Sequence, residues 1–196
     1  METTEKAEPE KTTTKKRAEL ISGNRVIVWD PEEGSQLYAE KFYGQPLGIR
    51  KPKSPQFTRP LELSLLEALY LLEKGKIELT DATDGHKITK EELAEKAEQT
   101  YIDFKTKYTV YRDLREKGYV VRPGLKFGAD FSVYEHGPGI DHAPLIVSVV
   151  PKGTQLSPIE TVRAGRLATS VRKKFVIATV GPTGEPKYYM FTWHKP

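Results

Sequence analysis

Cysteine is missing from this chain of 196 residues, and long apolar runs are missing as well. Without cysteine there is no disulfide, no thiolate nucleophile and no cysteine-ligated metal site, so any chemistry must use other side chains. No apolar run approaches the roughly 20 residues that a membrane-spanning helix needs. The first residues, Met1 to Glu5, lack the basic and apolar regions of a signal peptide. We therefore expect a soluble, cytoplasmic protein with no membrane partner.

Residues that heat damages easily are also scarce. Asn24 is the only asparagine, there are two methionines, and charged residues make up 30% of the chain. This bias is typical of proteins from thermophiles. The formal net charge of +4 favours an anionic partner, although the clustering of basic residues matters more than their sum.

Common motifs of catalytic and nucleotide-binding sites are absent from the sequence. There is no GxSxG elbow of a serine hydrolase, no GxxxxGK[ST] phosphate loop and no histidine pair at the helical spacing of metalloproteases. We therefore expect neither a catalytic metal nor a cofactor.

The first 100 residues divide into a tail and a small α+β domain. Residues 1–19 contain hardly an apolar side chain, so burial cannot offset the entropy of ordering and we expect a disordered tail. Within the domain, residues 20–100, the pattern predicts strands at 25–29 and 36–43. An acidic segment with proline and glycine separates them and is typical of a turn.

Two capping boxes and a proline-rich loop mark the rest of this domain. Ser64 and Thr89 are each followed three residues later by glutamate, a pattern that predicts the start of a helix. Residues 44–60 contain four prolines, which exclude a regular element and indicate an exposed loop. A loop that contacts a partner and a loop that is merely solvated both fit this composition. The basic side chains of the loop include those of Arg50, Lys51 and Lys53.

Residues 101–196 predict a second domain, in which strands alternate with one helix. The strands are expected at 119–122, 131–135, 145–150, 175–180 and 188–193. Ser157 is followed by proline and then glutamate, which predicts a helix between the third and fourth strands. We expect a mixed sheet with flanking helices, so the fold class is α/β (α+β).

Histidine is the natural acid–base group in a chain without cysteine. The histidines are His86, His136, His142 and His194. His136 and His142 flank a Gly-Pro-Gly turn directly after Tyr134, and the basic segment RKK at 172–174, which includes Lys173, follows the predicted helix of the second domain. If these strand ends meet at one edge of the sheet, a phenol, an imidazole and an ammonium group converge there.

Several longer segments together resemble a known family. They are YRDLREKGY at 111–119, GLKFGADF at 124–131, YE at 134–135 and SVRKK at 170–174. In this order they resemble the archaeal tRNA-splicing endonucleases over about residues 108–196, and residues 63–77 resemble the small domain of that family. The resemblance implies a catalytic subunit that cuts precursor tRNA at bulge-helix-bulge splice sites. It also implies 2′,3′-cyclic phosphate and 5′-hydroxyl ends, made without a metal ion.

The resemblance assigns three catalytic roles by position. Tyr134 matches the general base proposed for the family, His142 its general acid and Lys173 its transition-state stabiliser. His136 and Lys174 are the alternatives to His142 and Lys173. A phenol with an ordinary pKa of about 10 is a poor base at neutral pH, so we expect Lys173 also to lower the pKa of Tyr134.

RNA binding is implied in the same way. Arg166 matches an arginine of the family that stacks on an unpaired bulge base. Trp193 stands near the expected second member of that pair, with a core position on the last strand as the alternative. The basic loop around residues 50–53 resembles an insertion in the form of the enzyme that pairs a catalytic with a structural subunit, and we expect it to contact RNA.

The resemblance implies a dimer of dimers, joined partly by an acidic loop. Here the matching loop, residues 181–186, offers only Glu185, which argues against a tetramer of identical chains. We expect the chain to form a homodimer or to pair with a structural subunit in an α2β2 heterotetramer.

Two other interpretations fit part of the sequence. A non-catalytic structural subunit of the same assembly would bind RNA without cleaving it, but Tyr134, His142 and Lys173 are all retained. A metal-dependent DNA nuclease would use Asp130 and Glu135 as paired metal carboxylates. Activity in a chelator separates this class from a metal-independent ribonuclease.

Overall fold

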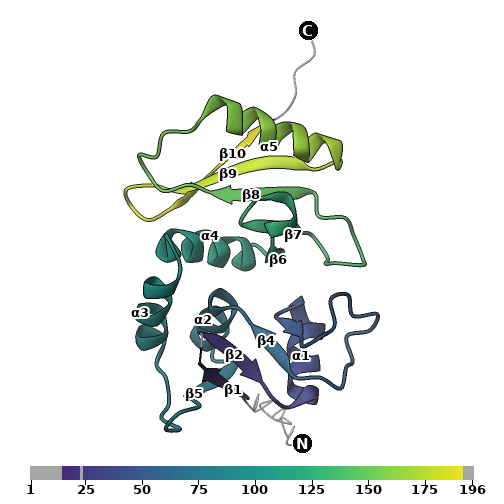
Figure 1. Ribbon diagram of the computed structural model, residues 1–196, viewed down its shortest axis with the longest axis vertical. Coiled ribbons are helices and arrows are strands. Elements are labelled where there is room, and N and C mark those ends of the chain that lie inside the picture. Colours follow the sequence, from purple (N-terminus) through teal and green to yellow (C-terminus); the bar gives the residue numbers. More distant parts are fainter. Residues whose placement is uncertain (1–14, 23, 192–196) are drawn as a thin grey trace, which may run out of the picture.

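The computed structural model describes residues 15–22 and 24–191. In this part of the chain each half of the sequence forms one five-stranded sheet, and helices pack against both sheets (Figure 1). The predicted mixed α and β class is confirmed. None of the helices described here combines the length and the apolar character needed to cross a membrane.

The N-terminal sheet has the strand order β3-β4-β2-β1-β5. Its strands are β1 (Lys16–Ile21), β2 (Arg25–Val28), β3 (Gln45–Pro46), β4 (Leu61–Leu63) and β5 (Ile77–Asp81). β1 pairs with β2 in the antiparallel and with β5 in the parallel direction. The prediction of a disordered tail is therefore wrong for residues 16–19, because a strand far along the chain orders them. Residues 1–14 lie outside the described part.

α1 (Pro31–Lys41) stands where the sequence pattern predicted a strand at 36–43, so that prediction is wrong. The Asp30 carboxylate caps the helix by accepting hydrogen bonds from the N–H groups of Glu32 at 2.8 Å and Glu33 at 3.1 Å. A proline in the first turn has the backbone angle that a helix needs, and the two glutamates face the positive end of the helix dipole. The acidic segment that the pattern predicts as a turn is in fact the first turn of α1.

Both predicted capping residues begin helices, although only Ser64 forms the reciprocal capping box. Ser64 precedes α2 (Leu65–Glu73) and Thr89 precedes α3 (Lys90–Thr100); α4 (Phe104–Glu116) follows α3 without a side-chain cap. Before α2, the Ser64 hydroxyl accepts a hydrogen bond from the Glu67 N–H at 3.3 Å, and the Glu67 carboxylate accepts one from the Ser64 N–H at 2.9 Å. Thr89 caps α3 by accepting a hydrogen bond from the Glu92 N–H.

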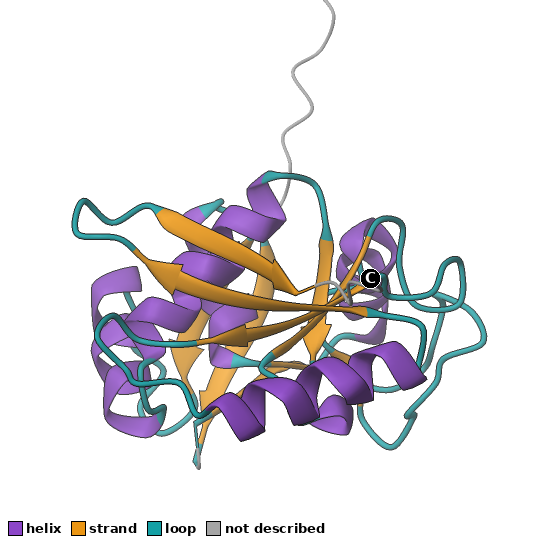
Figure 2. Ribbon diagram, turned by 90° about the horizontal axis from the view of Figure 1, so that it is seen from above, coloured by secondary structure: helices purple, strands orange, loops and turns teal. Residues whose placement is uncertain are grey.

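The C-terminal sheet has the order β10-β9-β8-β7-β6, and only β8 and β9 run parallel. Its strands are β6 (Val120–Pro123), β7 (Phe131–Tyr134), β8 (Leu145–Val149), β9 (Lys174–Val180) and β10 (Pro186–Phe191), with a short 3-10 turn, η1 (Leu125–Phe127), after β6. α5 (Pro158–Ser170) connects β8 to β9 and lies on the outer side of the sheet, while α4 lies on the inner side (Figure 1). The twist of the strands is visible from above in Figure 2.

A buried arginine on α4 joins the two halves of the chain. The Arg115 side chain is 1% exposed, and its guanidinium donates hydrogen bonds to the carbonyl oxygens of Lys41 at 2.8 Å and Val121 at 2.9 Å. It also donates to the Tyr111 hydroxyl at 2.8 Å and lies 3.9 Å from the Glu67 carboxylate. α4 is thereby attached to the end of α1, to α2 and to β6.

A second arginine, on β6, makes a parallel set of contacts. Arg122 donates hydrogen bonds to the carbonyl oxygens of Phe42 and Gly44, each at 2.6 Å, and to the side-chain oxygen of Gln45 at 2.8 Å. Its guanidinium lies 3.7 Å from the Glu67 carboxylate. Around this cluster one hydrophobic core runs from the N-terminal sheet through α2 and α4 to the inner face of the C-terminal sheet.

Replacement of Arg115 tests how strongly this cluster stabilises the fold. Arg115→Met leaves two buried carbonyl groups without their donor and Glu67 with one cation fewer. We expect the free energy of unfolding to fall by about 3 to 5 kcal/mol, measured by guanidinium-induced unfolding. Lys74→Met is the control, because Lys74 forms an exposed ion pair with Glu116 at 3.0 Å, and exposed ion pairs contribute little to stability. Equal losses in the two variants would contradict the assignment.

Candidate active site

The ends of three neighbouring strands bring the predicted catalytic residues to the same end of the C-terminal sheet. Leu145, the first residue of β8, lies opposite Val133 of β7 on one side and the start of β9 on the other. Tyr134 is the last residue of β7, and Lys173 directly precedes β9. His142 lies shortly before the start of β8. The phenol, the imidazole and the ammonium group therefore come from three neighbouring strands.

Lys173 lies across the junction between β8 and β9. Its Nζ donates a hydrogen bond to the Ala143 carbonyl oxygen at 2.6 Å and lies 5.4 Å from the centroid of the Phe127 ring. The Nζ of Lys126 lies 5.7 Å from the same ring. Burial lowers the pKa of Lys173 and the Lys126 ammonium lowers it further, while the Asp141 carboxylate opposes both. A charge partly withdrawn from water in this way acts more strongly on a nearby anion.

Tyr134 is half-buried, and burial raises its pKa above the ordinary value of a phenol. The Arg122 guanidinium lowers this pKa and the Asp141 carboxylate raises it, both by less than burial does. The expectation that Lys173 lowers the pKa of Tyr134 is wrong, since the opposing cation is Arg122. Burial dominates because a phenolate loses more hydration than a neutral phenol.

The loop between Tyr134 and His142 is closed by a single carboxylate. The Asp141 side chain accepts hydrogen bonds from the N–H groups of Glu135 at 2.9 Å, His136 at 3.2 Å and Gly137 at 2.7 Å. Burial works against the charged form of Asp141, but the three backbone donors outweigh it and hold the pKa of Asp141 below its usual value. Asp141 is therefore a charged acceptor around which the loop folds.

The same loop rests on the N-terminal half of the chain. Gly137 has a φ of 136°, and a Cβ atom at this position would overlap the ring of Phe42. Phe42 follows α1 with a φ of 56°, and its carbonyl oxygen accepts a hydrogen bond from Arg122. Only glycine allows this close approach, so the shape of the loop depends on a residue outside the C-terminal half.

The contacts of Lys173 and Lys174 differ. Its ammonium reaches the carbonyl of Ala143, the residue after His142, whereas the exposed Lys174 contributes its backbone N–H to the Pro144 carbonyl at 2.9 Å. His136 and His142 are both exposed, and they lie at opposite ends of the loop. His142 is the one that directly precedes Ala143, whose carbonyl Lys173 contacts.

Asp130, a candidate metal ligand in the sequence, has two protein partners. Its carboxylate accepts a hydrogen bond from the Val149 N–H at 2.8 Å and lies 3.0 Å from the ammonium of Lys107. Asp130 therefore joins α4 to β8. Across the described residues, no group of three or more His, Cys, Asp or Glu side chains is placed to hold a metal ion.

Comparison with known proteins shows to which protein family this chain is related. The N-terminal domain of the tRNA intron endonucleases matches residues 18–94, and their catalytic C-terminal domain matches residues 104–189. A tRNA-splicing endonuclease of Hyperthermus butylicus is 50% identical over 178 residues, which cover 90% of this chain and 98% of that protein. One of Saccharolobus solfataricus is 43% identical over 178 residues, 90% of this chain and 97% of that protein.

The chain belongs to the tRNA intron endonuclease family. It contains both domains of the family, including the catalytic one, and is a tRNA-intron lyase that acts in intron removal from precursor tRNA. The archaeal tRNA-splicing endonuclease resemblance of the sequence is confirmed.

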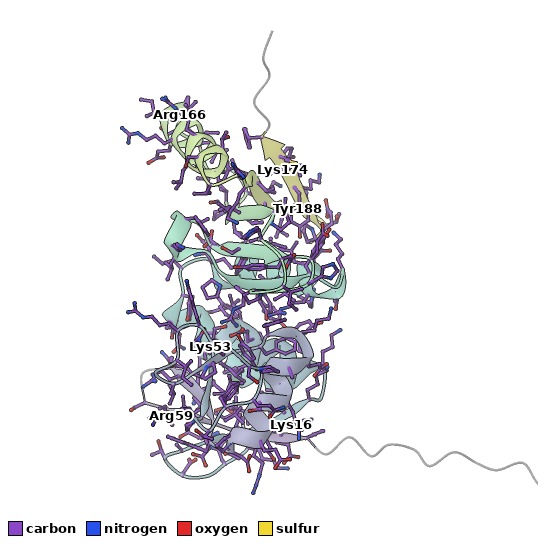
Figure 3. All side chains as sticks on the ribbon, turned by 90° about the vertical axis from the view of Figure 1, so that its right-hand side faces the viewer. Lys16, Lys53, Arg59, Arg166, Lys174 and Tyr188 are labelled. Atoms are coloured by element: carbon purple, nitrogen blue, oxygen red, sulfur yellow. The ribbon has the colours of Figure 1, made fainter. Side chains whose placement is uncertain are left out.

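The predicted RNA-binding residues of this endonuclease lie far apart. Arg166 is exposed on α5, and Arg50, Lys51 and Lys53 are exposed in the loop of the N-terminal half. Figure 3 shows Arg166 and Lys53 in the upper and lower parts of the molecule, separated along its long axis. One RNA that contacts both must extend along the molecule. Trp193 lies outside the described residues.

Several groups of the endonuclease site were missed by sequence reasoning. They are Phe42, Arg122, Lys126, Phe127 and Asp141. Asp141 carried a usable signal, because an aspartate beside a Gly-Pro-Gly turn commonly accepts hydrogen bonds from nearby backbone N–H groups. Arg122 and its acceptor at residue 42 are 80 positions apart, so no local pattern relates them.

Two glycines of the loop provide a matched test of its contact with Phe42. Both have positive φ, 136° at Gly137 and 90° at Gly139, but a Cβ atom at Gly139 would meet nothing within 4 Å. Gly137→Ala should therefore lower the free energy of unfolding by about 1 to 3 kcal/mol more than Gly139→Ala, since a packed ring must move. Thermal and chemical denaturation of both variants measure this difference. If the two losses are equal, the contact does not constrain the loop.

Proposed function

We propose that this enzyme cleaves precursor tRNA at bulge-helix-bulge splice sites and leaves 2′,3′-cyclic phosphate and 5′-hydroxyl ends. Tyr134, His142 and Lys173 carry the reaction, without a metal ion. The observation that supports this assignment best is that the three residues lie at or beside neighbouring ends of β7, β8 and β9, within the catalytic domain of the family.

The reaction requires one proton acceptor, one proton donor and one cation. Tyr134 takes the proton of the ribose 2′-hydroxyl, whose oxygen attacks the adjacent phosphorus. The bond from phosphorus to the 5′-oxygen then breaks, and His142 protonates that oxygen. Lys173 stabilises the negative charge that builds up on the phosphoryl oxygens, with its ammonium already partly removed from water.

The raised pKa of Tyr134 has a consequence for its role as the base. At neutral pH most of the phenol is protonated, and the fraction available as phenolate grows about tenfold per pH unit below the pKa. The Arg122 guanidinium lowers the pKa of Tyr134 and so increases the fraction of phenolate. Arg122 thereby contributes to the chemistry as well as to the contacts between the two halves of the chain.

Single substitutions test the three roles against near neighbours. Tyr134→Phe, His142→Ala and Lys173→Met should each lower the rate of cleavage by about 10² to 10⁴, because each removes one group that takes part in the transition state. His136→Ala and Lys174→Met are the matched controls. Single-turnover cleavage at saturating enzyme measures the rates. A control variant that loses as much activity as its neighbour would transfer the role to that control residue.

The RNA duplex and its bulges are recognised by groups distant from the reacting atoms. Arg166 on α5 stacks on a splayed bulge base, and Trp193 is the second member of the proposed pair. Stacking of this kind contributes about 1 to 3 kcal/mol per base. The support for Arg166 is that it is exposed on α5.

The basic loop of the N-terminal half contacts the RNA backbone. Arg50, Lys51 and Lys53 are exposed there. The double variant Lys51→Ala with Lys53→Ala should weaken binding of every precursor tRNA and reduce the slope of log Kd against log salt by about 1 per lost phosphate contact. Lys87→Ala with Lys90→Ala removes two exposed lysines elsewhere in the same half and serves as the control. Unchanged binding and cleavage in the first variant would exclude the loop from the RNA surface.

The chain assembles through its last strand, as a homodimer or with a structural subunit in an α2β2 heterotetramer. β10 is the edge of the C-terminal sheet, and Tyr189, Met190 and Phe191 on it are 55%, 50% and 40% exposed. Such an edge is a site for pairing with another chain. In the loop before β10 the Glu185 carboxylate already interacts with Thr183 and Lys187. Little uncompensated negative charge is therefore left for a second contact between identical chains.

Measurement of mass separates the two assemblies. The heterotetramer predicts that light scattering gives a larger mass when a candidate structural partner is added, and that cleavage requires this partner. The same elution mass with and without the partner would argue against the heterotetramer.

A further inference from the structure

We propose that Asp141 is a positioning residue of the cleavage reaction, which fixes the separation between Tyr134 and His142. The inference rests on the proposed function, because it takes these two side chains as the proton acceptor and the proton donor. Asp141 itself touches neither the substrate nor the reacting atoms in this account.

The position of the hydrogen bonds carries the argument. Glu135 directly follows Tyr134, and Asp141 directly precedes His142. The hydrogen bond of 2.9 Å from the Glu135 N–H to the Asp141 carboxylate therefore joins the backbone neighbours of the two reacting residues. This contact therefore constrains the distance between the proposed base and the proposed acid.

The rest of the loop is organised around the same side chain. One carboxylate oxygen accepts from Glu135 and His136, and the other accepts from Gly137 at 2.7 Å. In the opposite direction, the Gly137 carbonyl oxygen accepts from the N–H groups of Ile140 and Asp141, both at 3.1 Å. The loop is thus a closed ring of hydrogen bonds, and Phe42 packs against it from outside.

The charge of Asp141 acts on both sides of the site. Its carboxylate adds to the pKa of Tyr134 and to that of Lys173, which shows that it lies within electrostatic reach of each. A neutral amide at this position would remove that influence as well as one acceptor atom. Loss of the charge alone would lower the pKa of Tyr134 and favour its phenolate, so the positioning role rests on the hydrogen bonds of the loop.

The isosteric variant Asp141→Asn is the direct test. An amide has one acceptor oxygen, and its NH2 group would face at least one backbone N–H, so the ring of hydrogen bonds opens. We expect the rate of the chemical step to fall by about 10- to 100-fold, the scale of a displaced catalytic group. Binding of precursor tRNA should not weaken, because the substitution removes a negative charge that repels phosphate. A purely structural role would not separate the rate from the affinity in this way.

Asp84→Asn is the matched control. Asp84 also accepts a hydrogen bond from a backbone N–H, that of His86 at 3.1 Å, but it lies in a turn of the N-terminal half. The same atoms change, and we expect no effect on the rate or on the affinity. His142→Ala, measured beside both variants, reports on the proposed function itself.

The outcomes are distinguishable. A slow Asp141→Asn variant with unweakened RNA binding, beside an inactive His142→Ala variant, supports the proposal. If Asp141→Asn cleaves as fast as the unmodified chain while His142→Ala is inactive, the positioning role is lost and the proposed function stands. If His142→Ala cleaves normally, the proposed function itself fails.

Hydrogen exchange tests the proposal without any substitution, in case Asp141→Asn does not fold. In the unmodified full-length chain, the amides of residues 135–137 should exchange slowly although Glu135 and His136 are exposed, because the Asp141 carboxylate holds their N–H groups. Exchange of these amides as fast as that of a free loop would overturn it.

Discussion

The Glu67 carboxylate is the group on which both halves of the molecule depend. It completes the capping box of α2 with Ser64, accepts a hydrogen bond from the Gly44 N–H at 2.9 Å, and lies 3.9 Å from Arg115 and 3.7 Å from Arg122. A carboxylate buried without partners would cost several kcal/mol, and the two arginines of the other half add to the hydrogen bonds that Glu67 accepts from Ser64 and Gly44. The cluster of Glu67, Arg115 and Arg122 therefore attaches the small N-terminal domain to the C-terminal half.

The geometry of the active site follows from this junction. Arg122 donates to the Phe42 carbonyl, and the Phe42 ring packs against Gly137 in the loop that joins the proposed base to the proposed acid. Asp141 closes that loop from within. The proposed reacting residues thus lie at one end of the sheet, beside a loop whose shape is determined partly by the other half of the chain. A catalytic domain on its own would lack the outer support of this loop.

Local sequence signals predicted the elements that depend on local interactions. The capped starts of α2, α3 and α5 and the strands of the C-terminal sheet were read correctly, because caps and alternation act within a few residues. β1 was missed since its parallel partner β5 lies far along the chain, with Lys16 opposite Ile77. The pattern predicts a strand in place of part of α1, because Asp30 and the acidic residues after it are also typical of a turn. The candidate catalytic residues came from the family resemblance, whereas Asp141 and Arg122 emerged only from their contacts in the fold.

We propose that the chain's own side chains cleave RNA through attack by the ribose 2′-oxygen. The most direct measurement uses a precursor tRNA with a single 2′-deoxy nucleotide at the splice site, compared with the all-ribose RNA in EDTA, together with the structural partner if the chain requires one. The account predicts that the ribose substrate is cut to a 2′,3′-cyclic phosphate and a 5′-hydroxyl, and that the deoxy substrate is not cut at that position. Cleavage of the deoxy substrate, or 5′-phosphate ends that appear only when a divalent metal is added, would contradict it.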